Sequence, residues 1–207
     1  MLRFIRHDVH PLNPQARLLQ YFATQIRAGA VVAVPSAAGY ALVCRFDDKS
    51  ATGRLRRCAD PDERSPAALL CRDLAQAAGH LHIDDRAYRA LRASADGGQA
   101  FALRANRQVP RRLAATAGGI VLLHFGGHAV LQALLDLLDE PLLMALPPSV
   151  AREIDTLPAA WLGIIDAAMD AGALPDAGLP EVVDLDGLLQ ARPSLSRWLS
   201  SAPELAY

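Results

Sequence analysis

Short apolar runs with the composition of β-strands alternate along this chain with segments whose apolar residues recur at helical spacing. This alternation limits the possible folds more than any other feature, because strands and helices that follow one another build layered α/β domains. Strands are predicted over residues 30–34, 40–46, 99–105, 118–125 and 141–146, and helices over residues 49–57, 84–94 and 128–138. The segment 67–74 is predicted to be a buried strand that turns into a helix at Asp73.

Several of the predicted connections are too short for a parallel crossover, which needs about a dozen residues or more, so the sheet is expected to be mixed. A chain of 207 residues is long enough for one domain with a sizeable core. The predicted fold class is therefore α/β, a single domain with a mixed sheet flanked by helices. Its first helix is expected to be capped by Asn13, to have Pro14 at its first position and to end at Gly29.

The last quarter of the chain is harder to assign. Residues 159–172 fit a helix with one apolar stripe. A short strand around 163–165 fits as well, because a short apolar run is compatible with either a helix or a strand. Residues 180–187 are predicted to form a strand that leaves the domain core. Residues 191–207 are predicted to form a terminal helix followed by a loose end.

The charges are unevenly distributed although the net charge is only −1. Residues 1–113 contain 18 basic and 10 acidic side chains, whereas residues 114–207 contain 3 basic and 12 acidic ones. A basic half can form a surface for a polyanion such as RNA. The alternative is that the two halves neutralise each other within one fold.

Cysteine usage and hydropathy predict where the protein resides. The three cysteines, Cys44, Cys58 and Cys71, are odd in number and widely spaced, which argues against a disulfide framework and a zinc site. No apolar run approaches the length of about 18–20 residues that a membrane span needs. A cytoplasmic protein without a membrane partner and without a bound metal is expected.

No strong local motif for phosphate binding or nucleophilic catalysis is present. The chain lacks a Walker-type glycine loop, a dinucleotide-binding glycine motif and a nucleophile elbow. His124 and His128 flank the turn "HFGGH" between a predicted strand and a helix, where an anion could bind. The alternative is that each ring is simply hydrogen-bonded within the fold.

Two clusters of arginines are candidates for contacts with phosphate or carboxylate groups. They are "RLRRC" (54–58) and "PRRL" (110–113), in which Arg54, Arg57, Arg111 and Arg112 are the candidates. Guanidinium groups suit both anions because they form paired hydrogen bonds with them. On helices, however, such runs are more often solvated faces.

Several stretches, taken in order, resemble the YrdC-like superfamily and specifically its YciO-like branch. They are "HPLNPQARLL" (10–19), "GAVVAVPSAAGYALVCRFDDK" (29–49), "LLCRDL" (69–74), "QVPRRL" (108–113) and "QALLDLLDEPLL" (132–143). The resemblance is strongest over residues 9–146 and less certain over 147–207. It implies a twisted mixed β-sheet with a positively charged concave face, described in this superfamily as binding double-stranded RNA.

Active members of the superfamily make threonylcarbamoyl-adenylate from threonine, bicarbonate and ATP, which feeds a modification of adenosine in tRNA. The resemblance therefore implies ATP with Mg²⁺ as a ligand. It places the ligand-binding residues at Ser36, Arg57, His124 and His128. Most of the matching positions are nevertheless altered in this chain, so no catalytic residue is assigned.

The alterations remove polar groups where the family has them. After Pro35 and Ser36 the polar pair of the family is replaced by two alanines, and after Arg57 the second basic residue is replaced by Ala59. The family's Arg and Ser of the turn after the central strand align with His124 and Gly127. The family's Ser-Thr-Ser aligns with residues 144–146, Met-Ala-Leu. Because each missing hydrogen-bond donor costs transition-state stabilisation, catalysis is expected to be lost.

Three functions remain open on this basis. The first is a diverged protein that binds RNA (tRNA or double-stranded RNA) or a nucleotide through Arg57, Arg111 and Arg112. The second is an active threonylcarbamoyl-adenylate synthase, in which His124, when protonated, takes the place of the lost arginine. The third is a module that holds a protein partner in the former cleft or on its acidic half.

Overall fold

The computed structural model of the protein describes residues 4–59, 67–93, 98–114, 118–175, 178 and 180–185. The strands are β1 (Ile5–Asp8), β2 (Val32–Ser36), β3 (Gly39–Arg45), β4 (Ala67–Cys71), β5 (Gln99–Arg104), β6 (Ile120–Phe125), β7 (Leu142–Ala145), β8 (Ala167–Asp170) and β9 (Glu181–Asp184). The helices are α1 (Ala16–Arg27), α2 (Lys49–Ala59), α3 (Leu74–Ala78), α4 (Asp85–Ala93), α5 (Arg111–Ala114), α6 (Ala129–Leu138), the 3₁₀ helix η1 (Ile154–Thr156) and α7 (Ala159–Leu162).

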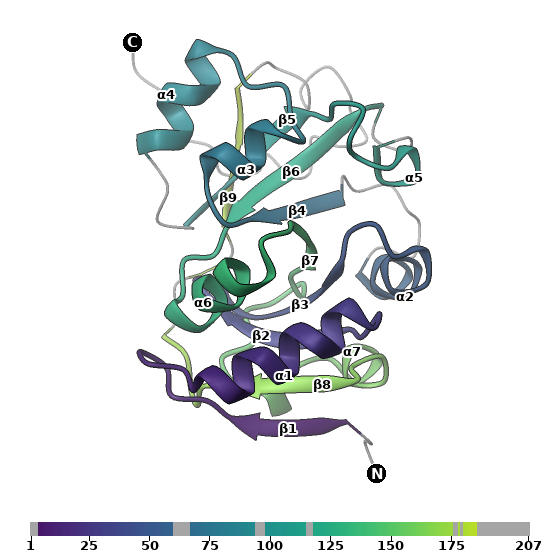
Figure 1. The fold of residues 1–207 in the computed structure, drawn as a ribbon, viewed down its shortest axis with the longest axis vertical. Helices are drawn as coiled ribbons and strands as arrows, with labels where there is room; N and C mark the ends of the chain where they lie inside the picture. Colours follow the sequence, from purple (N-terminus) through teal and green to yellow (C-terminus); the bar gives the residue numbers. More distant parts are fainter. Residues whose placement is uncertain are drawn as a thin grey trace.

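All of these strands join one sheet in the order β1-β8-β2-β3-β7-β4-β6-β5-β9 (Figure 1). Parallel pairs (β1–β8, β2–β8, β4–β6 and β5–β9) coexist with antiparallel ones (β2–β3, β3–β7, β4–β7 and β5–β6). The predicted single α/β domain with a mixed sheet is therefore confirmed.

Helices pack on both faces of the sheet. Alternate residues of β2 and β3, such as Val32 and Val43, pack in a cluster with α1 and α6, which cross the same face in Figure 1. Their neighbours in sequence, such as Val31 and Cys44, pack in a second cluster with residues of α2, α4, α5 and α7. Both faces of these strands are thus buried, which explains their continuous apolar runs.

The start of the first helix was predicted wrongly, whereas its end is confirmed. Helix α1 begins at Ala16 after Gln15, and Asn13 instead donates its backbone N–H to Nδ1 of His10 at 3.0 Å. The helix ends before Gly29, whose φ of +90° lies in the left-handed region that favours glycine. The predicted helix start at Asp73 is confirmed, because its carboxylate accepts the Gln76 N–H at 2.8 Å.

The helix predicted over 159–172 is mostly wrong. Only Ala159–Leu162 is helical, and the strand β8 follows at Ala167–Asp170, beyond the alternative position at 163–165. Strand β8 lies between β1 and β2 and is buried on both faces, so its sequence shows no period of two.

The strand predicted near residue 180 exists, but it does not leave the core. Strand β9 pairs in parallel with β5 at the edge of the same sheet. Val182 and the following Leu185 are buried. Strand β1 was missed, and the predicted terminal helix over 191–207 lies outside the described residues.

The two oppositely charged halves of the sequence neutralise each other in the fold. Among the ion pairs between described residues, those that join a basic residue of the first half to an acid of the second are Arg6–Asp155, Arg6–Asp170, Arg27–Glu140, Arg45–Glu140, Arg54–Asp166 and Arg72–Asp139. The charge asymmetry along the sequence is therefore reduced by ion pairs between the two halves. Only arginines outside these pairs remain as candidates for contacts with a ligand. In the described part of the chain, no helix is both long and apolar enough to cross a membrane.

Candidate anion-binding site

Ser36 lies at the end of β2, where the β2–β3 hairpin turns back, and its hydroxyl is used within the turn. The hydroxyl donates to the carbonyl oxygen of Gly39 at 2.6 Å and accepts the N–H of Ala38 at 3.2 Å. The residue is 5% exposed. Because the turn uses the only proton of this hydroxyl, Ser36 stabilises the hairpin and has no donor left for a ligand.

The same turn is covered by a later segment of the chain. The N–H of Tyr40 donates to the carbonyl oxygen of Ala151 at 2.7 Å. A Cβ on Gly39 would lie 2.7 Å from that oxygen and 3.1 Å from Cγ1 of Val150. The loop that the family resemblance assigns to ligand binding is therefore closed against residues 150 and 151.

The apolar replacements in the former site belong to the core. Met144 is 5% exposed and packs with α1 and α6, whereas Phe125 is 6% exposed and packs on the other face of the sheet. Ala145 is buried as well. The side chains at the family's phosphate-binding position are thus buried and present no polar group that fits ATP.

The two histidines of "HFGGH" have different structural roles, and neither carries a positive charge at neutral pH. His124 is buried in β6, and burial lowers its pKa to about 4. His128 is the N-cap of α6, where its Nδ1 accepts the N–H of Val130 at 3.2 Å, and burial lowers its pKa too. Burial therefore argues against a protonated His124 in the place of an arginine at neutral pH.

The sheet register also keeps Ser36 and His124 apart. His124 pairs with Leu70, Leu70 with Leu142, and Leu142 with Arg45, so these residues form one row across the sheet. Ser36 pairs with Gly39, six residues before Arg45 on β3. This offset corresponds to about 20 Å along the strands. Ser36 and His124, which the resemblance places in one site, therefore do not meet.

Two of the arginine candidates are occupied within the fold. Arg54 donates to both carboxylate oxygens of Asp166, at 3.2 and 2.8 Å, and to the carbonyl oxygen of Gly29 at 3.0 Å. Arg112 donates to the carbonyl oxygens of Phe46 and Asp47, at 3.1 and 2.7 Å. We therefore interpret Arg54 and Arg112 as structural residues.

Replacing Arg54 by glutamine should lower the free energy of unfolding by about 1 kcal/mol, because a partly exposed ion pair and a hydrogen bond are lost together. Arg57 lies one turn further along α2, is exposed, and has no hydrogen bond or ion pair to another described residue. The matched variant Arg57→Gln should leave stability unchanged, as measured by urea unfolding of both proteins. Equal losses in the two variants would contradict the structural role of Arg54.

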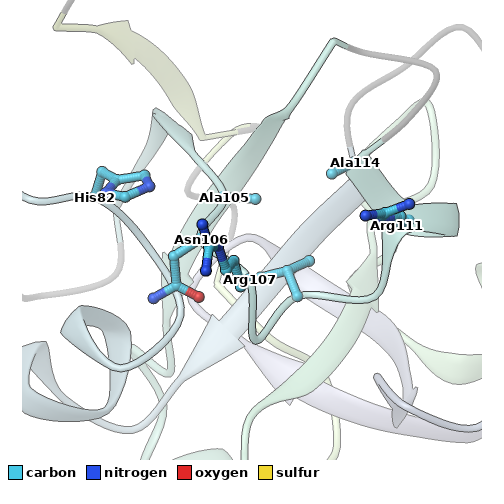
Figure 2. A pocket seen from close by; sticks show the side chains of 7 residues that line it. His82, Ala105, Asn106, Arg107, Arg111 and Ala114 are labelled. Atoms are coloured by element: carbon cyan, nitrogen blue, oxygen red, sulfur yellow. The ribbon is translucent and has the colours of Figure 1, made fainter.

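Arg111 is different, because it lines an open hollow on the surface. We call this hollow, lined by His82, Ala105, Asn106, Arg107, Val109, Arg111 and Ala114, the basic hollow. Its volume is about 390 Å³. Figure 2 shows His82 on one side and Arg111 on the other, with Asn106 and Arg107 between them.

Backbone and amide hydrogen bonds hold the floor of the basic hollow. Asn106 donates its N–H to the carbonyl oxygen of His80 at 2.8 Å and its side-chain amide to that of Gly79 at 2.9 Å. Its Oδ1 accepts the N–H of Gln108 at 2.8 Å. Opposite, His82 donates its N–H to the carbonyl oxygen of Arg104 at 2.9 Å. The lining residues of two separate segments, 79–82 and 104–108, are thereby fixed relative to each other.

The charge of the basic hollow is positive and uncompensated. Arg107 and Arg111 are both exposed, and neither has an ion pair or a hydrogen bond from its guanidinium to another residue that the structure describes. No carboxylate is among the residues that line the hollow. Because guanidinium groups stay charged at all relevant pH values and match phosphate geometry, this arrangement can bind an anion.

Sequence reasoning found Arg111 but missed His82, Asn106 and Arg107. The segment "RANRQVPRR" (104–112) is rich in arginine, a signal that could have extended the candidate list to Arg107. His82 had no such signal, because the isolated bridge between Leu81 and Ala105 brings it there from another segment.

None of the three cysteines is activated as a nucleophile. Burial raises the pKa of the Cys58 thiol, and it raises those of Cys44 and Cys71 to about 12.

A protein-family model and several curated proteins match the sequence of this chain. The family model Sua5_yciO_yrdC, described as "Telomere recombination", matches residues 24–187. The uncharacterized protein YciO of Escherichia coli strain K12 is 33% identical over 150 residues, which cover 71% of this chain and 73% of that relative. An uncharacterized protein of Haemophilus influenzae is 32% identical over 135 residues, 65% of each chain.

Solved structures agree with the fold. The crystal structure of E. coli YciO aligns with a TM-score of 0.82 at 28% identity, covering 88% of this chain and 91% of that one. Sua5 of P. abyssi, crystallised with L-threonine, aligns with a TM-score of 0.78 at 20% identity, covering 87% of this chain and 54% of Sua5. At that identity the similarity to Sua5 establishes a common fold.

Proposed function

Because the chain belongs to the Sua5/YciO/YrdC family and to its YciO-like branch, we propose that it is a non-catalytic member that binds RNA through the basic hollow. The observation that carries the proposal is the pair of exposed, unpaired guanidinium groups of Arg107 and Arg111. These two arginines and His82 gather around one hollow that has no carboxylate among its lining residues. Such a site attracts the phosphate backbone.

Loss of catalysis is supported by the fate of the family's ligand-binding positions. The Ser36 hydroxyl is committed to its own turn, His124 is neutral, and Met144 is in the core. Joining threonine, bicarbonate and ATP requires clustered positive charge and preorganised donors at one place. Incubation with these three substrates and Mg²⁺ should therefore release no pyrophosphate above the background without protein. Threonine-dependent release would overturn this part of the proposal.

RNA binding is tested with a fluorescein-labelled tRNA transcript and a 20-base-pair RNA duplex, titrated with the protein at several salt concentrations. The affinity should fall steeply with salt, because cations that neutralise phosphates release counterions. In the double variant Arg107→Gln/Arg111→Gln, the slope of log K against log salt should become shallower by about 2. Fluorescence anisotropy measures both quantities.

A matched control separates the site from the overall charge. Arg17 is an exposed arginine at the start of α1, and within the described residues its side chain has no ion pair. Helix α1 lies at the other end of the molecule from α5 in Figure 1. Arg17→Gln should keep the wild-type slope. Binding that is absent in the wild type, or insensitive to the double variant, would contradict RNA binding by the basic hollow.

A further inference from the structure

We propose that the basic hollow is a receptor for a phosphomonoester, so that the protein recognises the phosphorylated 5′ end of an RNA in preference to the middle of a strand. This inference rests on the proposed RNA binding and specifies which part of the RNA enters the site. It follows from the shape of the hollow, its charge and the residues that line its apolar side.

The shape of the hollow favours an end over a continuous strand. Its volume of about 390 Å³ lies near the lower limit for small-molecule sites, which span about 300–1,000 Å³. Its lining comes from three segments, around residue 82, residues 105–109 and residues 111–114, with His82 and Arg111 on opposite sides (Figure 2). A space of this size can take a phosphate with one nucleoside, whereas a duplex backbone would only cross its rim.

The charge of the hollow suits a dianion. A phosphomonoester carries a charge of about −1.5 to −2 at neutral pH, and an internal phosphodiester carries only one negative charge. Arg107 and Arg111 supply two permanent positive charges with paired N–H donors. His82 adds an exposed imidazole on the opposite side. This set of donors gives a terminal phosphate an advantage over an internal one.

The apolar part of the lining is small. Ala105, Val109 and Ala114 offer methyl groups, and no phenylalanine, tyrosine or tryptophan side chain lines the hollow. Single-strand readers that grip bases usually do so by stacking on aromatic rings. The recognition should therefore depend on the phosphate and little on which base follows it.

The site is also prepared before any ligand arrives. The side-chain amide of Asn106 donates a hydrogen bond to the carbonyl oxygen of Gly79, and its Oδ1 accepts the N–H of Gln108. The backbone N–H of His82 donates to the carbonyl oxygen of Arg104. The two flexible side chains, Arg107 and Arg111, thus extend from a fixed frame. A preorganised frame reduces the ordering that binding would otherwise cost.

The test compares a labelled 12-nucleotide RNA that carries a 5′-phosphate with the same RNA that carries a 5′-hydroxyl. We expect the phosphorylated RNA to bind about tenfold more tightly, which corresponds to about 1.4 kcal/mol. The preference should disappear in Arg107→Gln/Arg111→Gln, fall in His82→Gln and persist in Arg17→Gln. Circular dichroism and urea unfolding of each variant confirm that it is folded.

Competition by free phosphomonoesters shows whether the terminal phosphate that the hollow binds belongs to an RNA or to a free nucleotide. AMP should compete with the 5′-phosphorylated RNA, and adenosine should not. If AMP binds as tightly as the RNA does, the phosphomonoester site stands and its natural ligand is a free nucleotide. If the two RNAs bind equally and AMP does not compete, the inference is wrong while RNA binding stands. If neither RNA nor AMP binds, both proposals fail.

Discussion

Replacing Gly39 by alanine should lower the free energy of unfolding by about 3 kcal/mol. Gly39 has a φ of +95°, where a Cβ costs about 1–2 kcal/mol of strain. The added Cβ would also lie 2.7 Å from the carbonyl oxygen of Ala151, an oxygen that accepts the Tyr40 N–H. Moving that oxygen weakens a buried backbone hydrogen bond, which is worth about 1 kcal/mol more. Urea unfolding measures the difference.

Gly172 provides the matched control for Gly39. Its φ is +81°, but a Cβ there would meet nothing within 4 Å. Gly172→Ala should therefore show only the conformational strain, about 1–2 kcal/mol. If both variants lost equal stability, the closure of the β2–β3 turn by residues 150 and 151 would make no energetic contribution.

Replacing Asp170 by alanine should destabilise the protein by about 2–4 kcal/mol, because the Gly172 N–H loses its acceptor while Arg6 and the Tyr40 hydroxyl each lose one of theirs. The Asp170 carboxylate accepts Nε of Arg6 at 2.6 Å, the N–H of Gly172 at 2.8 Å and the Tyr40 hydroxyl at 3.0 Å. These contacts join β1, β3 and the end of β8. Tyr40→Phe removes only the hydroxyl and should cost less, about 1–2 kcal/mol, so equal effects would contradict the central role of the carboxylate.

The same carboxylate predicts a dependence on pH. Burial alone would raise the pKa of Asp170, but hydrogen bonds from Gly172, Arg6 and Tyr40 outweigh burial and lower it. The stability that Asp170 contributes is therefore complete above its unfolded pKa of about 3.9, and it is lost as the pH falls through the lower folded value. The stability difference between the wild type and Asp170→Ala should shrink below about pH 4, as measured by urea unfolding at each pH.

Much of the fold was predictable because most strands are buried runs bounded by turn residues, and most helices have one apolar face. Strand β1 was missed because its residues, Ile-Arg-His-Asp, are mostly exposed and show no apolar run. Strand β8 was missed because its three consecutive buried residues, 167–169, look the same as part of a buried helix. In both cases the strand is defined by its partner in the sheet and not by its own sequence.

The candidate site was less predictable, because the availability of an arginine depends on distant residues. Arg54 was a reasonable candidate until the fold brought Asp166 to it from 112 positions away. Arg112 and Arg111 are adjacent in sequence, yet Arg112 bonds to the backbone before α2 and Arg111 faces the basic hollow. The altered family positions, in contrast, could be recognised from the sequence alone, because the replacement of a hydroxyl or a charged side chain is visible without knowledge of the tertiary structure.

The position of β8 has a consequence for the order in which the protein can be made. Strand β1 is synthesised long before its neighbour in the sheet, β8, whose last residue is Asp170. Strand β2 has β8 on the same side. Strand β1 must therefore wait, unpaired, until Ala167, 162 residues after its partner Ile5, has been synthesised. One edge of the sheet closes late, and the nascent chain exposes strand edges to chaperones during that interval.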